Sequence, residues 1–74
     1  MERIMKTFNE KKVGKLASFR NITNYMTVNG FKFQVDLDDL LIFYRPKDVI
    51  FVYVEVKPRT RHNYIIQGAT WFEG

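Results

Sequence analysis

Residues 40–57, which read LLIFYRPKDVIFVYVEVK, decide the fold class. Two runs rich in β-branched and aromatic residues flank Arg45-Pro46-Lys47-Asp48, where proline at the second position favours a type I turn. Side chains of an extended strand alternate between two faces. One face of the second run carries Ile50, Val52, Val54 and Val56. The other face carries Phe51, Tyr53, Glu55 and Lys57. The segment therefore predicts an antiparallel hairpin with strands at residues 40–44 and 49–57.

A second hairpin is predicted just upstream of this one. Residues 22–28 and 31–37 flank Asn29-Gly30, a dipeptide that tolerates the positive φ angles of a type I′ turn. The later run places its apolar residues on one face, namely Phe31, Phe33, Val35 and Leu37. We therefore expect two hairpins in succession between residues 22 and 57.

The two ends complete the predicted fold. Apolar residues at helical spacing predict a short amphipathic helix near the start, namely Met1, Ile4, Met5 and Phe8. This helix is expected to end near Gly14 or to fray to Ala17. Pro58 is expected to interrupt the long strand, with residues 61–67 as a last strand and residues 68–74 as a tail anchored by aromatic residues. The predicted class is α+β: a short N-terminal helix packed on a four- to five-stranded antiparallel sheet.

Composition narrows the class of protein. With 74 residues, 46% of them hydrophobic, the chain fits a single small domain, residues 1–74, and is too apolar for a disordered tail. It has no cysteine and one histidine, His62, which excludes disulfides, thiolate-held zinc and multi-histidine metal sites. Its apolar runs fall short of a membrane span, and no secretory signal is visible, so we expect a cytoplasmic protein without a cofactor.

Charge points towards nucleic acid. The net charge is +4, and Lys57, Arg59, Arg61 and His62 gather at one strand junction. Arginine forks suit phosphate oxygens, and aromatic side chains on an open sheet face offer stacking surfaces for unpaired bases. The predicted function is a small basic non-catalytic module that binds RNA or single-stranded DNA. Its predicted site comprises Phe51, Tyr53, Lys57, Arg59, Arg61, His62 and Tyr64.

A protein partner is the alternative. A domain this small hides only about 60% of its unfolded surface, so a homodimer or a tight partner is expected to add stability. Trp71 and Phe72 are the candidate contact residues, because aromatic side chains dominate protein interfaces. Under this hypothesis the chain is a small viral or mobile-element accessory protein that binds and inhibits a host protein.

Two resemblances point to nucleases. The stretch from Phe31 to Tyr64 resembles the closing half of the RelE-like ribonuclease toxins, which implies that Arg59, Arg61, His62 and Tyr64 grip and cleave messenger RNA. Asp39 followed by Glu55-Val56-Lys57 looks like the PD-(D/E)xK nuclease core. This second resemblance implies a Mg²⁺ ion held by the carboxylates of Asp39 and Glu55, with Lys57 beside the phosphate.

The acidic group Asp36, Asp38 and Asp39 is expected to form a solvated turn. The predicted nucleic-acid site depends on the position of the helix. If the helix covers Phe51 and Tyr53, the stacking surface is lost.

Overall fold

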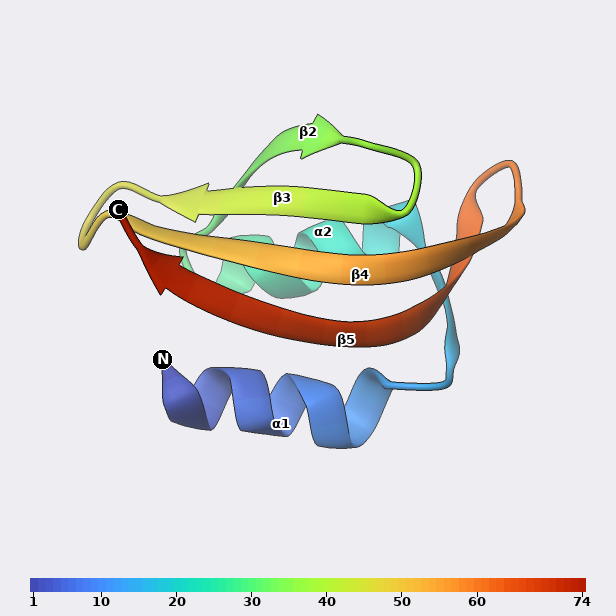
Figure 1. Ribbon diagram of the computed structural model, residues 1–74, viewed down its shortest axis with the longest axis horizontal. Coiled ribbons are helices and arrows are strands. Elements are labelled where there is room, and N and C mark those ends of the chain that lie inside the picture. The colour runs from blue at the N-terminus through green and yellow to red at the C-terminus, as the bar shows by residue number, and fades with distance from the viewer.

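The computed structural model describes all 74 residues as two helices and five strands (Figure 1). Their bounds in chain order are α1 Glu2–Lys12, β1 Leu16–Ser18, α2 Phe19–Val28, β2 Lys32–Asp36, β3 Leu40–Arg45, β4 Ile50–Thr60 and β5 Asn63–Glu73. The strands form one antiparallel sheet in the order β1-β5-β4-β3-β2. The predicted α+β class, with an N-terminal helix packed on an antiparallel sheet, is confirmed.

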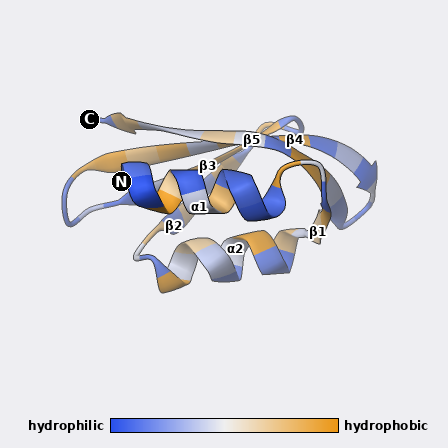
Figure 2. Cartoon of the chain, turned by 90° about the horizontal axis from the view of Figure 1, so that it is seen from below, coloured by the Kyte–Doolittle hydropathy of each residue, from blue (hydrophilic) through white to orange (hydrophobic).

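Both helices lie on the same side of the sheet (Figure 2). Met5 and Phe8 of α1 and Ile22 and Met26 of α2 are buried there. The sheet supplies the other side of the core with Leu41, Phe43, Ile50, Val52, Val54, Val56, Tyr64, Ile66 and Ala69. We call this side of the sheet the covered face. The opposite side has no helix over it, and we call it the free face.

Residues 22–28 form a helix, so the predicted upstream hairpin is wrong. Ser18 caps the start of α2, where its hydroxyl accepts a hydrogen bond from the Asn21 amide at 3.0 Å. Asn29-Gly30 ends the helix instead of turning a hairpin. The amide of Gly30 donates to the Thr27 carbonyl and that of Phe31 donates to the Met26 carbonyl, while Gly30 has φ +87°. These are the two hydrogen bonds of a Schellman motif with glycine in the left-handed conformation.

The predicted hairpin of residues 40–57 is confirmed as β3 and β4, which pair from Leu40↔Glu55 to Arg45↔Ile50. The loop between these strands is residues 46–49, so it ends one residue later than the predicted turn. Its last residue, Val49, has φ +56°, an uncommon conformation for a β-branched side chain. A short strand, β2, adds to the outer edge of β3 with a register shift between Phe33 and Val35.

The C-terminal part of the sheet is longer than predicted. Pro58 does not end the strand, since β4 runs on to Thr60 with register shifts after Glu55 and after Pro58. Residues 68–74 are not a separate tail, because β5 extends to Glu73 and pairs with β4 along its length. Two 11-residue strands therefore form the centre of the fold.

Arg45 fastens the loop end of the sheet to the rest of the molecule. Its guanidinium lies 4.8 Å from the centre of the Phe31 ring and donates to the Asn29 carbonyl at 3.1 Å. It also donates to both carboxylate oxygens of Asp48, at 2.9 and 2.6 Å, which lowers the pKa of Asp48 below its ordinary value. The end of α2 and the β3–β4 loop are thus held by one side chain.

Neither helix has the length and apolar content needed to cross a membrane.

Candidate functional site

The free face carries four aromatic rings on β3, β4 and β5, towards the end of the sheet where the β3–β4 loop lies. Phe51 and Tyr53 on β4 point away from the helices, because Ile50, Val52 and Val54 on the same strand are buried in the core. Directly paired residues of an antiparallel sheet share a face. Tyr44 of β3 pairs with Phe51, and so does Phe72 of β5, which adds two more rings to the free face.

The four rings form two contacting pairs. The centres of Tyr44 and Phe51 are 4.7 Å apart, with their planes at 34°. The centres of Tyr53 and Phe72 are 4.9 Å apart, with their planes at 58°. Three of the rings are partly buried, and Phe72 is 51% exposed. We call these four residues the aromatic platform.

Of these four rings, the predicted nucleic-acid site contains only Phe51 and Tyr53. Tyr44 was missed, and Phe72 was assigned to a different site. The observed register of β3 and β4 puts Tyr44 opposite Phe51, whereas the predicted turn at residues 45–48 puts it opposite Val49 on the same face. No residue pattern gives the position of Phe72, because it depends on β5 continuing past Gly68.

The predicted cations lie beyond one end of the platform. Lys57, Arg59, Arg61 and His62 are all exposed around the β4–β5 turn, and we call them the basic turn. Lys57 is on the free face, about 13 Å along β4 from Tyr53 at the usual rise per residue. The turn is held in place because the Phe19 amide donates to the His62 carbonyl at 3.0 Å.

Tyr64 lies apart from the platform, in the lining of a depression that it shares with Arg61 and with two carboxylates, Asp36 and Asp38. Its side chain is on the covered face with 8% exposure, and its hydroxyl donates to a carboxylate oxygen of Asp36 at 3.2 Å. Burial raises the pKa of Tyr64, and the negative charge of Asp36 raises it further. Tyr64 thus ties β5 to the end of β2, and little of its side chain is exposed.

Trp71 and Phe72 lie on opposite faces of β5. Trp71 pairs with Val52 and packs against the core, whereas Phe72 pairs with Phe51 on the free face. The structure therefore does not bring the two aromatic residues together into one contact surface.

Asp39 and Glu55 lie close together. They line one shallow depression with Leu40, Tyr53, Thr70 and Phe72, and we call it the Tyr53 pocket. The Val56 amide donates to the Asp39 carbonyl at 3.0 Å, which holds the β2–β3 loop against β4. Lys57 is exposed two residues along the same strand from Glu55. No group of three or more His, Cys, Asp or Glu residues is placed to hold a metal ion.

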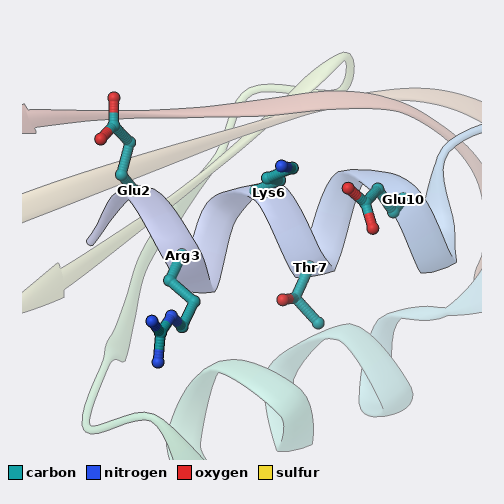
Figure 3. A pocket seen from close by; sticks show the side chains of 5 residues that line it. All are labelled: Glu2, Arg3, Lys6, Thr7 and Glu10. Atoms are coloured by element: carbon teal, nitrogen blue, oxygen red, sulfur yellow. The ribbon is translucent and has the colours of Figure 1, made fainter.

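A second depression follows the outer surface of α1. Its lining is entirely polar, with side chains from successive turns of the helix (Figure 3): Glu2, Arg3, Lys6, Thr7 and Glu10. Cations and carboxylates are interspersed there and no aromatic ring is present. This surface has the mixed charge of an ordinary solvated helix face.

Comparisons of the chain with protein-family models, with curated proteins and with solved structures give no match. The two nuclease resemblances stay predictions.

Proposed function

We propose that the protein binds single-stranded nucleic acid on the free face of its sheet. The observation that carries the proposal is the position of the helices. Both cover the face of Val52 and Val54, so no helix lies over the half-buried rings of Phe51 and Tyr53. Base stacking on aromatic side chains is worth about 1–3 kcal/mol per base and tolerates any sequence, because every base has a π-face.

The charge of the chain supports the same function. Phosphates of a strand lying along β4 would reach Lys57 and then the arginines of the basic turn, all of which are exposed and free of ion pairs. Lys32, paired with Tyr44, provides a cation at the other side of the platform. A strand recognised in this way contacts the aromatic platform with its bases and the surrounding cations with its phosphates.

The test is fluorescence anisotropy with labelled single-stranded oligonucleotides of about ten nucleotides, which is within the range that small sheet domains cover. Phe51→Leu keeps an apolar side chain and removes the ring, so we expect affinity to fall about 5- to 100-fold. The triple variant Lys57→Ala, Arg59→Ala, Arg61→Ala should weaken binding and flatten its dependence on salt between about 50 and 200 mM.

Lys6→Ala is the matched control. Lys6 is an exposed cation on the outer surface of α1, remote from the free face, and its loss removes one charge without touching the platform. We expect it to bind almost as the wild type does. Absence of binding at about 50 mM salt, or equal affinity of the wild type and Phe51→Leu, would contradict the proposal.

A protein partner is a second candidate, favoured by the apolar character of the free face. Leu16 pairs with Ile65 at the β1 end of this face and is 61% exposed, and Phe72 is 51% exposed. Under this alternative the chain is an accessory protein that inhibits its target through Phe72 and its neighbours. Affinity for a partner that survives Phe72→Ala would remove this assignment.

A further inference from the structure

The Tyr53 pocket combines aromatic rings, which attract bases, with carboxylates, which repel phosphates. Tyr53 and Phe72 supply two of the four rings of the aromatic platform, and the contacting rings line the pocket. Asp39 and Glu55 add two carboxylate side chains to the same lining. The structure contains one salt bridge, between Arg45 and Asp48, so neither pocket carboxylate is neutralised by a cation of the chain.

Phosphate groups are repelled from this pocket, because its two carboxylates carry the same sign of charge. An aromatic base is not repelled, since it is neutral and can stack on the rings. A carboxylate is acceptor-only, so it binds the base through N–H groups at the edge of the ring. Resting on the proposed function, the pocket therefore receives a base and not the backbone of the bound strand.

Guanine is the base whose edge fits a carboxylate best. Its Watson–Crick edge presents two adjacent donors, N1–H and the 2-amino group, which meet both carboxylate oxygens at once. Adenine and cytosine each place one donor beside an acceptor nitrogen, and uracil flanks its single donor with two carbonyl oxygens. A bidentate pair discriminates against a wrong base by about 5- to 150-fold in its affinity constant.

Glu55 is the carboxylate placed for this contact. It is exposed on the free face, two residues along β4 from Tyr53, so both side chains point to the same side. Its cross-strand partner on β5 is Gly68, which has no side chain. A Cβ built at Gly68 would meet no atom within 4 Å, so open space lies beside Glu55 where a base can enter.

We propose that the Tyr53 pocket is a guanine-selective base site, in which guanine stacks on one ring of the Tyr53–Phe72 pair while its N1–H and 2-amino groups donate to Glu55. Asp39 lines the same pocket and disfavours phosphate there. The rest of the aromatic platform, Tyr44 and Phe51, accepts any base. The protein would thus bind single strands generally and prefer those with a guanine in one position.

The test compares anisotropy of four labelled oligouridines that carry one central guanine, adenine, cytosine or no replacement. The wild type should bind the guanine probe about fivefold or more tightly than the other three. A probe with inosine in place of guanine lacks the 2-amino donor and should lose most of this preference. Equal affinity for all probes would overturn the inference.

Two variants distinguish recognition of guanine by Glu55 from simple repulsion of the strand by its negative charge. Glu55→Gln keeps the shape of the side chain but presents an amide, so the preference for guanine should disappear while the uridine probe stays bound. If Glu55→Gln strengthens binding of all probes by one common factor, the carboxylate only repels the strand and the inference fails. Gly68→Val fills the open space beside Glu55 without altering any charge, and it should also abolish the preference.

Failure of the inference can be told from failure of the proposed function. Binding that depends on Phe51 but is equal for all probes rejects the guanine site alone. No binding of any probe at low salt rejects both. Circular dichroism of Glu55→Gln and Gly68→Val should match the wild type, because residue 55 is exposed and valine suits a strand.

Discussion

The side-chain amide of Asn9 pairs with the backbone of Ala69 like a neighbouring strand. Its Nδ2 donates to the Ala69 carbonyl at 3.1 Å, and its Oδ1 accepts from the Ala69 amide at 2.8 Å. Ala69 lies in β5 beyond the short strand β1, which pairs only with Asn63, Tyr64 and Ile65. Asn9 of α1 thus provides hydrogen-bond partners for the edge of β5 at Ala69, which β1 does not reach.

Asn9→Ala should destabilise the fold by about 1–3 kcal/mol, because it leaves two partly buried backbone groups without partners. Urea unfolding followed by circular dichroism measures this loss. Asn9→Asp is the matched variant, since it retains the acceptor but turns a second acceptor towards the Ala69 carbonyl. We expect it to be no more stable than Asn9→Ala. An unchanged urea midpoint for Asn9→Ala would mean that water replaces the amide at no cost.

Arg45→Lys should also be destabilising, by about 1–3 kcal/mol. Lysine keeps the charge, but a single ammonium cannot bridge both oxygens of Asp48, reach the Asn29 carbonyl and lie flat on the Phe31 ring. Thermal unfolding measures the change. Lys47→Ala is the control, because Lys47 is an exposed cation of the same loop. An unchanged melting temperature for Arg45→Lys would show that only the charge at this position matters.

The stability of the protein at alkaline pH should depend on the ionisation of Tyr64. Its folded-state pKa is raised, so the contribution of the neutral phenol to stability is complete below the unfolded pKa of about 10 and is lost as pH rises through the folded value. Absorbance at the tyrosinate band should show a late titration phase that belongs to Tyr64. The late phase should be missing from Tyr64→Phe. In Asp36→Asn it should shift to lower pH without vanishing, since burial is the larger cause.

Val49→Asn should stabilise the protein by about 1 kcal/mol. Valine at φ +56° carries a steric cost of about 1–2 kcal/mol, and asparagine tolerates the left-handed region much better. The side chain is 44% exposed, so little packing is lost. A raised melting temperature is the expected result. Ile50→Asn, one residue later at a buried position, should instead be strongly destabilising.

The spacing of apolar residues predicted those elements of the fold for which the spacing fits only a strand or only a helix. Residues 50–56 alternate strictly between buried and partly exposed positions, and Met5 and Phe8 lie three residues apart on one helix face. The strand predicted at residues 22–28 is wrong because Asn29-Gly30 is compatible with both a type I′ turn and the end of a helix. The cap at Ser18 and the helical spacing of Ile22, Tyr25 and Met26 were the signals for a helix.

The candidate site was harder to predict, because it depends on which face the helices cover. The strand pattern puts Phe51 and Tyr53 on one face and cannot say whether that face is open. Tyr64 is the opposite case, since it follows the exposed residues Arg61 and His62 closely in sequence while its own side chain is buried. Register shifts after Glu55 and after Pro58 alter which side chains share a face, and no residue pattern announces them.

The β4–β5 hairpin extends beyond the end of β3, and under the proposed function this extension affects the rate at which nucleic acid is bound. Towards the β4–β5 turn, the pairing of β3 with β4 ends at Leu40, opposite Glu55. The basic turn therefore projects beyond the edge of the platform. Exposed cations at a projecting point meet an approaching polyanion before the rings do. Salt should therefore slow capture of the strand mainly by screening the basic turn, whereas the lifetime of the complex should be governed by the four rings. The two halves of the site would thus set different rate constants.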